Sequence, residues 1–401
     1  MRIFLIAICN FLIIIPPLWA QFSFEKIKDK DNFEYQRAVE FYWTPRYNRV
    51  EGLFLNGGLN YLPPLVPSLT LYGDVGAGFW NESDQRLRYT FGIKKDLTEF
   101  NTTTIGAELF RSLESQDEWI IGDVENSLAS LFFREDYKDY YGSQGFKFFI
   151  EHQFLEIHTL RFEIGRKKYD SLRRNINWSV FGGNFAENPK RADSFIAEGD
   201  ELGIKLAVAF DWRDNPLFPQ TGWYVETIYE HTGDDFDTDG LFVTIKHFQQ
   251  PFVNHRLILR GLVGTRQGSL AEQYRLDLGG IGSLRGFEDK EFTGNRLFMI
   301  NANYFFGGTV LQKLPLHRVP VIGGFWTILS LGIFVDTGWT NLVNPDVGIF
   351  EGFGDFSLDD LQTNIGFSII VLEGLFRMDV AKVTNRSDSN IRVTFRLLES
   401  L

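Results

Sequence analysis

Apolar and polar residues alternate along much of the chain with a period of two. The alternation is clearest in five stretches, at residues 160–164, 204–211, 256–263, 365–371 and 391–397. In the last of them, Ile391, Val393 and Phe395 alternate with Arg392 and Thr394. Because successive side chains of a β-strand point to opposite faces, this pattern predicts many strands with one apolar face and one polar face.

The strands follow one another along the whole chain. Five are predicted after residue 292, at Thr293–Phe306, Phe325–Gly338, Leu361–Val371, Leu375–Val383 and Asn390–Leu398. About eleven more precede them, beginning near Val50, which gives about sixteen strands of about ten residues each. The count is left open between residues 117 and 184, because residues 118–134 also fit a helix or an inserted loop.

The composition indicates that these strands belong to a membrane protein. Aromatic residues make up 16% of the chain and charged residues 23%, and no apolar run after the first 20 residues reaches the length of a membrane helix. Charges of both signs on the polar face suit a water-filled lumen, and only a closed sheet pairs all backbone groups in lipid without helices. We therefore predict an all-β fold, a transmembrane antiparallel β-barrel of 16 strands in a bacterial outer membrane. A soluble sandwich would show the same alternation.

The first residues are typical of an export signal. Arg2 precedes an apolar run at residues 3–15, and Ala20 offers a small residue for cleavage. We predict a signal peptide at residues 1–20, a short periplasmic lead-in at residues 21–46 and the barrel at residues 47–401. The single cysteine, Cys9, lies inside the predicted signal, so the mature chain has no thiol for a disulfide.

Few patterns in the chain suggest chemistry. The net charge of −12 argues against nucleic acid as a partner. The six histidines are scattered without a spacing that suits zinc, and no cofactor is expected. Residues 235–240 resemble the start of a calcium loop, but Lys246 stands where such a loop needs glutamate. We expect no enzymatic activity.

One glycine-rich stretch interrupts the alternation. Residues 279–292 read GGIGSLRGFEDKEF. With Leu284–Phe287 at its centre, the stretch resembles the sixth-loop motif of the BamA/TamA-type outer-membrane barrels, the bacterial surface antigen family. Three further stretches resemble that family in order, namely Tyr47–Gly52, Asp214–Trp223 and Phe334–Gly338. The resemblance spans residues 47–401. Relatives usually carry periplasmic domains before the barrel, but the lead-in at residues 21–46 is too short for a folded domain, so we expect a barrel without periplasmic POTRA domains.

The resemblance implies that the sixth loop folds into the barrel. By alternation Asp336 faces the lumen, and a buried arginine needs a carboxylate or several acceptors. Arg285 is expected to pair with Asp336, while Gly286 lets Phe287 pack against the inner wall. Asn303 stands where relatives often carry a glutamate, so the lock is expected to rest on Asp336 alone. Glu288 or Asp289, just after the motif, is either a further partner or solvated. The predicted loop lock comprises Leu284, Arg285, Gly286, Phe287, Asn303, Phe334, Asp336 and Gly338. From alternation alone, an exposed loop with a solvated arginine is as good an interpretation.

Closure of a barrel needs its first and last strands to pair. The predicted first strand is weakened by glycines, since glycine packs no side chain. The predicted seam comprises Gly52, Gly57 and Gly58 on the first strand and Val393, Phe395 and Leu397 on the last. By resemblance, this seam opens to admit client strands or lipids.

The resemblance implies a barrel that inserts or translocates proteins or lipids at the outer membrane. The alternative is a gated or passive pore, or a structural surface barrel, with the loop as a plug. The expected partners are outer-membrane lipids, together with unfolded outer-membrane proteins or a periplasmic partner.

Overall fold

The computed structural model describes residues 39–397 with several gaps. The gaps are at residues 67, 80–85, 99–101, 156, 192–193, 217, 270, 307–328, 372–375 and 387–389. The predicted signal peptide and the first part of the predicted lead-in, residues 21–38, lie outside the described residues.

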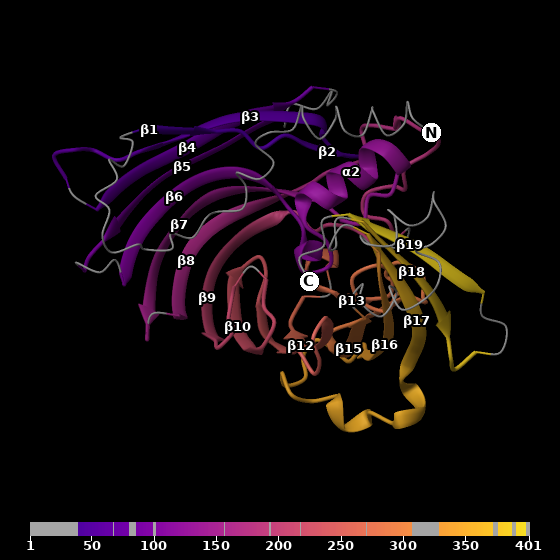
Figure 1. Ribbon diagram of the computed structural model, residues 1–401. Coiled ribbons are helices and arrows are strands. Elements are labelled where there is room, and N and C mark those ends of the chain that lie inside the picture. The colour runs from indigo at the N-terminus through magenta and orange to yellow at the C-terminus, as the bar shows by residue number, and fades with distance from the viewer. Residues whose placement is uncertain are drawn as a thin grey trace, which may run out of the picture.

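A single antiparallel sheet of 17 strands forms the body of the molecule (Figure 1). Its strands are β1 (Val39–Tyr42), β2 (Arg46–Asn48), β3 (Gly52–Tyr61), β4 (Leu69–Gly78), β5 (Leu87–Asp96), β6 (Thr103–Glu114), β7 (Tyr141–Phe154), β8 (His158–Ser171), β9 (Gly199–Asp211), β10 (Gly222–Asp234), β11 (Thr238–Gln249), β12 (His255–Gln267), β15 (Arg296–Phe306), β16 (Leu329–Asn341), β17 (Gln362–Val371), β18 (Phe376–Val383) and β19 (Ile391–Leu397). From β3 to β19 each strand pairs with the next along the chain in this list.

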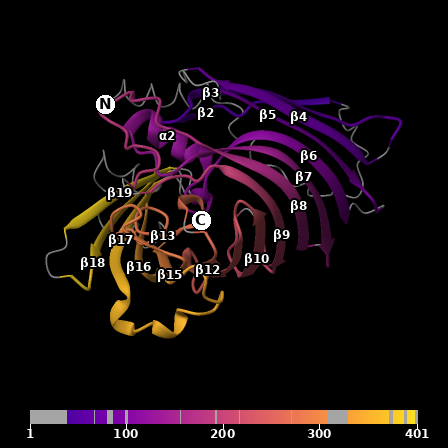
Figure 2. The same cartoon turned by 180° about the vertical axis from the view of Figure 1, so that it is seen from behind.

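The first position of the sheet is shared by two short strands. β1 pairs with the second half of β3, and β2 pairs with its first residues. Because β1 and β2 share one position, the 17 described strands fill 16 positions. Pro45 lies in the break between them, where Thr44 instead donates its backbone N–H to the Asn56 side chain at 2.7 Å. The sheet curls around a common interior, as views from opposite sides show (Figures 1 and 2).

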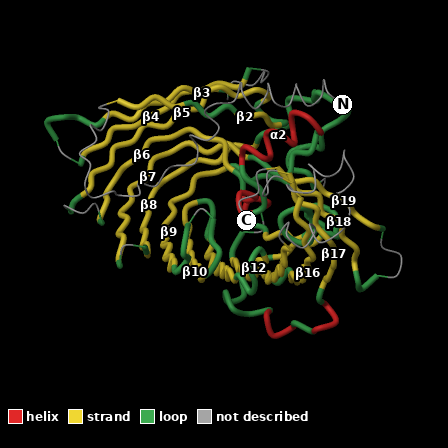
Figure 3. The backbone as a smooth tube through the Cα atoms, in the orientation of Figure 1, coloured by secondary structure: helices red, strands yellow, loops and turns green. Residues whose placement is uncertain are grey.

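The remaining described elements lie in the connections between strands, and Figure 3 shows the helices among them in red. The α-helix α2 (Asp123–Phe133) follows β6, and the two-stranded ribbon β13 (Leu276–Leu278) and β14 (Phe292–Gly294) follows β12. Short 3₁₀ helices are η2 (Gln116–Trp119), η3 (Glu272–Tyr274), η5 (Phe353–Asp355) and η6 (Leu358–Asp360). Among the described residues, no helix is long and apolar enough to cross a membrane.

The two faces of the sheet differ in character. On β16, Ile333 and Val335 are 54% and 43% exposed on the outer face, whereas Asp336 is fully buried on the inner face. The registers place Asn301, Asp336 and Asn364 side by side on neighbouring strands. An apolar surface that faces outward over many strands, with charges inside, is the arrangement of a membrane barrel.

Aromatic rings gather on the outer face at the end of the sheet opposite α2. Phe210 stacks on Trp212 with ring centroids 5.5 Å apart, and Trp223 stacks on His247 at 4.0 Å. Trp212 and Trp223 are both exposed. Such rings are enriched where the apolar band of a barrel meets the headgroup layer.

The predicted strands after residue 292 agree with β15 to β19 within a few residues, apart from residues 325–328, 375 and 398, which lie outside the described part. The helix or insertion considered for residues 118–134 is α2. Paired strands of the described part begin at Val39, within the segment predicted to be a periplasmic lead-in and before the predicted start of the barrel at residue 47. The strand that carries Gly52, Gly57 and Gly58 is β3, which is not the edge, since β1 and β2 pair with it.

The assignment of faces predicts the effect of a charge on each side of the sheet. Val335→Arg places a guanidinium on the outer apolar face at the middle of β16, and should lower the free energy of unfolding in lipid vesicles by about 2–4 kcal/mol. The control is Thr90→Arg on the inner face of β5, opposite Asp74, which should cost less than about 1 kcal/mol. Equal costs in urea titrations of the two variants would show that the faces are wrongly assigned.

Candidate functional site

Loop 6, which we define as residues 268–295 between β12 and β15, turns back onto the inner face of the sheet. Its tip is a tight turn in which Gly280 donates its N–H to the carbonyl of Leu284 at 3.1 Å. Gly280 has φ +89°, a conformation that strains any residue with a Cβ. The Ser283 hydroxyl also accepts the N–H of Gly279 at 2.8 Å. The turn therefore presents Arg285 to the barrel wall in a fixed orientation.

Arg285 and Asp336 form a forked ion pair inside the barrel. Nε donates to one carboxylate oxygen of Asp336 at 2.9 Å and Nη2 to the other at 2.6 Å. The backbone N–H of Arg285 adds a third bond at 3.2 Å. Arg285 is 5% exposed and Asp336 fully buried. Two parallel bonds between a guanidinium and a carboxylate give both energy and a defined geometry.

The guanidinium of Arg285 has further partners in the wall. Its Nη1 lies 3.4 Å from the carboxylate of Asp379 on β18, and Nη2 donates to the side-chain oxygen of Asn303 at 2.9 Å. The aromatic ring of Phe334 lies under the guanidinium carbon at 3.4 Å. Arg377 donates to the other oxygen of Asp379 at 2.8 Å. Two acids thus face two arginines in one buried cluster.

Two asparagines complete the bonding of Asp336. Asn301 on β15 and Asn364 on β17 each donate a side-chain N–H to this carboxylate at 2.9 Å. Asn301 also donates to the carbonyl of Ser283 in the turn at 2.8 Å. Because a buried carboxylate is costly unless its oxygens are bonded, the amides make this position tolerable for an acid. We call Arg285, Asn301, Asn303, Asp336, Asn364, Arg377 and Asp379 the inner cluster.

Apolar packing holds the same turn from the other side. Leu284 and Phe287 are buried with Leu278, Leu297, Met299 and Val383 in one hydrophobic cluster. A Cβ on Gly286 would lie 2.7 Å from the Cβ of Asn364, so only glycine permits this approach of the turn to the wall. A Cβ on Gly338 would lie 2.8 Å from Leu278, so this strand position also requires a minimal side chain.

The outer part of loop 6 joins a second buried network. Nζ of Lys290 lies 2.6 Å from Asp139, 2.9 Å from Asp117 and 3.6 Å from Asp277. Asp117 and Asp139 belong to the connection between β6 and β7, so this lysine ties two loops together. Burial opposes the charge on Lys290, but the three carboxylates raise its pKa well above the ordinary value.

The connection between β2 and β3 enters the same network. Arg49 is fully buried, lies 2.6 Å from Asp139, and donates to the backbone carbonyl of Asp136 at 3.0 Å. Glu51, also fully buried, pairs with Arg88 at 3.0 Å. We call residues 49–51, 115–140 and 172–198, together with Asp277 and Lys290 of loop 6, the cap. The family motif at residues 47–52 thus lies in the ion network of the cap.

Helix α2 lies between the last strand and the first position of the sheet (Figures 1 and 2). Glu125 accepts the backbone N–H of Leu397 on β19 at 2.8 Å and pairs with Arg396 at 3.0 Å. On its other side, Ser127 accepts the backbone N–H of Tyr47 on β2 at 3.1 Å. At 3.6 residues per turn, Glu125 and Ser127 point in nearly opposite directions, so one helix reaches both edges.

Among the described strands, no register pairs β19 with β1, β2 or β3. The place where a barrel would close is therefore bridged by side chains of α2. We use the word seam from here on for this junction between β19 and β2. Val393 and Phe395 are exposed on the outer face of β19.

The structure brings together all the residues of the predicted loop lock: Leu284, Arg285, Gly286, Phe287, Asn303, Phe334, Asp336 and Gly338. The expectation that Asp336 is the only carboxylate partner of Arg285 is wrong, because Asp379 shares the guanidinium. Of the residues predicted at the seam, Leu397 contacts α2, whereas the glycines lie one strand away from the edge. The alternation put Asp379 and Arg377 on the inner face but gave no sign that β18 meets the loop tip.

Comparisons with known proteins agree with this geometry. Residues 84–397 match the Omp85 superfamily domain. The chain is similar to a structure of BamA from Haemophilus ducreyi lacking POTRA domains 1–3, with a TM-score of 0.56, 11% identity and coverage of 90% of this chain and 69% of that chain. This likeness supports the fold.

Two structures of CdiB give lower scores. For CdiB from Acinetobacter baumannii the TM-score is 0.45 at 13% identity, with 90% of this chain and 60% of that chain covered. For CdiB from Escherichia coli it is 0.42 at 12%, with 90% and 62% covered. The chain thus spans less than two thirds of either CdiB chain. No curated protein matches the chain.

Removing the carboxylate of Asp336 should release loop 6. Asp336→Ala removes the forked carboxylate partner of Arg285, and loss of one partner of a buried pair costs about 3–5 kcal/mol. Limited proteolysis of the folded barrel should then cut within residues 268–295. The control is Glu163→Ala, which removes an equally close partner of Arg161, at 2.5 Å, on β8 away from the loop. If the loop of Asp336→Ala resists protease as well as the parent does, the pair does not hold it.

The cap should loosen in acid because of Asp139. Burial opposes ionisation of this carboxyl, but Lys290 and Arg49 outweigh it and lower its pKa to about 2. A depressed carboxyl pKa contributes stability above the unfolded value near 4, and this contribution, about 2 kcal/mol, is lost as the pH falls toward about 2. Burial raises the pKa of Asp117 despite Lys290, so Asp117 is protonated first and contributes with the opposite sign.

The measurement is the rate at which pepsin cuts the cap between pH 4 and pH 2. The rate should rise steeply with acidity in the parent, and Asp139→Asn should lack this step because it has no proton to gain at that position. A step of the same size in both proteins would assign the transition to other groups.

Proposed function

The chain belongs to the Omp85 superfamily, and from that membership we propose that it inserts or translocates proteins or lipids at the outer membrane. The observation that carries the proposal is the seam. The last strand has a backbone N–H bonded to a helix side chain rather than to a neighbouring strand. An edge strand with an unpaired ladder is a template for another strand, which suits a barrel that receives unfolded clients.

In this proposal helix α2 occupies the seam until a client arrives. Glu125 accepts three bonds from β19, and Ser127 accepts one from β2. A client strand that pairs with β19 would replace the bond to Leu397 with a full ladder. Separation of α2 from β19 therefore leaves no backbone group unbonded once the client is in place, which keeps the cost of opening small.

The fixed inner cluster supports the same mechanism. Arg285 ties loop 6 to β15, β16 and β18, so this half of the wall stays rigid while the seam moves. A rigid wall beside a movable edge lets one strand separate without loss of the fold. The partners that follow from the proposal are outer-membrane lipids, and unfolded outer-membrane proteins delivered by a periplasmic protein. Nothing in this mechanism calls for an enzymatic step.

A cross-link across the seam tests the proposal. Cysteines introduced as Glu125→Cys and Arg396→Cys, joined by a short bifunctional thiol reagent, should fix α2 to β19. The natural Cys9 lies in the predicted signal peptide and would not interfere. The parent barrel in vesicles should speed the folding of a small outer-membrane barrel or the transfer of lipid between leaflets, and the cross-link should abolish this.

The control pair is Lys167→Cys with Glu201→Cys. These residues form an ion pair at 3.5 Å on the neighbouring strands β8 and β9, away from the seam. Cross-linking them should leave the activity of the barrel unchanged. The proposal fails if the seam cross-link has no effect, or if the parent speeds neither process beyond empty vesicles.

A pore with loop 6 as its plug is the second candidate. The observation that favours it is the burial of Arg285 and Phe287 on the inner face of the sheet, because a loop held inside a barrel narrows the path of a solute. A plugged pore should conduct little as the native protein and strongly as Arg285→Ala in planar bilayers. A low conductance in both proteins would leave the insertion or translocation proposal as the better account.

A further inference from the structure

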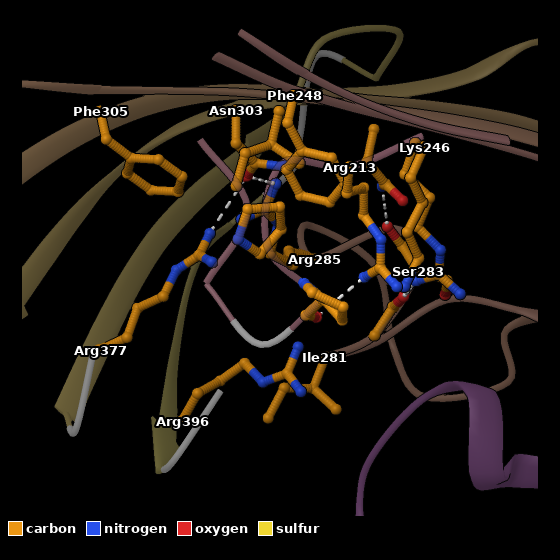
Figure 4. Close-up of a pocket in the computed structure, with 16 residues that line it drawn as sticks. Arg213, Lys246, Phe248, Ile281, Ser283, Arg285, Asn303, Phe305, Arg377 and Arg396 are labelled. Carbon is orange, nitrogen blue, oxygen red and sulfur yellow. Dashed lines mark hydrogen bonds between the residues drawn. The ribbon is translucent and has the colours of Figure 1, made fainter. Parts of the chain in front are cut away.

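A cavity of about 180 Å³ lies inside the barrel beside the tip of loop 6 (Figure 4). One side is formed by Ile281, Gly282 and Ser283 of the loop. Another side is formed by Arg213, Pro216 and Pro219 from the turn that joins β9 to β10, at the end of the sheet opposite the cap. Strands β11, β12, β15, β18 and β19 supply the rest of the lining. The inner cluster closes only one side of the cavity, so most of its lining belongs to residues with no part in the loop lock.

The lining of the cavity is strongly basic. Among the described residues that line it, none is acidic and six are cationic: Arg213, Lys246, Arg260, Arg285, Arg377 and Arg396. Figure 4 shows Arg377 and Arg396 extending from one side and Arg213 and Lys246 lying on the other. Phe248, Ile258 and Phe305 add an apolar part.

Carboxylates behind the lining balance four of these cations. Arg213 bonds Asp211, Arg285 bonds Asp336, Arg377 bonds Asp379, and Arg396 bonds Glu125, all within 3.0 Å. These acids lie in the wall or the cap and are already bonded to their arginines. They fix the guanidinium groups in place, as the supporting residues of a binding site do.

Lys246 and Arg260 are arranged differently. They stand directly opposite each other in the ladder of β11 and β12, on the inner face. Like charges in such a pair destabilise a sheet. No carboxylate among the described residues lies within ion-pair distance of Lys246, and the nearest acid on the next strand, Glu226, accepts from the hydroxyl of Tyr224 at 3.2 Å. Arg260 donates to two backbone carbonyls of the turn and the cap, those of Gly282 and Trp119.

We infer that this cavity binds a phosphate group. An anion placed between Lys246 and Arg260 would lower the repulsion between these two cross-strand cations, and the neighbouring arginine forks match tetrahedral oxygens. Several converging cations suit a dianion better than a carboxylate, which a single arginine satisfies. The apolar residues would contact the carbon part of a phosphate ester. Inorganic phosphate and the phosphorylated headgroup of a lipid share this chemistry.

The test uses the purified full barrel in an uncharged detergent and phosphate-free buffer, titrated by calorimetry with inorganic phosphate and then with short-chain phosphatidic acid. A single saturable site for either probe supports the inference. Binding of free phosphate identifies the soluble ion as sufficient, and binding of phosphatidic acid alone identifies the lipid headgroup as the source.

Substitutions assign the binding to the cavity. Lys246→Gln should weaken the affinity about tenfold or more, the usual loss for one charge-assisted bond, while Lys246→Arg should retain it. The control is Lys94→Gln, which removes a lysine from β5 outside this cavity. Heat-modified mobility on a gel shows whether each variant is folded.

The inference is overturned if neither probe saturates, if folded Lys246→Gln binds as the parent does, or if citrate binds as tightly as phosphate. It stands apart from the proposed function, because binding is measured on the isolated barrel. A barrel that binds phosphate but folds no client would refute the one proposal and support the other.

Discussion

A guanidinium that leaves bulk water must be paired, and in this protein the pairing of Arg285 fixes loop 6 to the barrel wall. Arg285 lies on a loop, yet it is 5% exposed and bonded to residues of three strands. Burying any one of these two carboxylates or this guanidinium alone would cost far more free energy than burying the three as a bonded group. The loop tip, the inner faces of β15 to β18 and the amides around Asp336 therefore form together or not at all.

Loop 6 also connects this cluster to the rest of the barrel. Through Lys290, loop 6 forms ion pairs with Asp117 and Asp139 of the cap. On its other side, loop 6 contacts β19, where Arg392 pairs with Asp289 at 3.3 Å and donates to the carbonyl of Phe287. Arg396, four residues further along β19, pairs instead with Glu125 of α2. The last strand is thus held on its inner face by a loop and on its edge by a helix. Side-chain bonds of this kind can be exchanged singly, whereas a β-ladder has to be opened along its whole length.

Much of the fold could be predicted from the sequence, because period-two alternation is a local property of each strand. The strand positions after residue 292 and the placement of Asp336 on the inner face follow from it. The partners of Asp336 and Asp379 could not be derived in this way, since they come from strands that the registers bring together across long stretches of chain. The first strand was missed for a physical reason too. Pro45 breaks it into β1 and β2, and neither piece is long enough to show alternation. Nor does the sequence indicate that α2, placed between β6 and β7, reaches the seam.

The central claim is that Arg285 and Asp336 interact inside the barrel as one unit. A double-mutant cycle measures this most directly, with the free energies of unfolding of Arg285→Ala, Asp336→Ala and the double variant determined in lipid vesicles. If the two groups are bonded partners, the double variant should be more stable than the sum of the single losses implies, with a coupling of about 1–3 kcal/mol. Strictly additive losses would contradict the account, because they would mean that neither group senses the removal of the other.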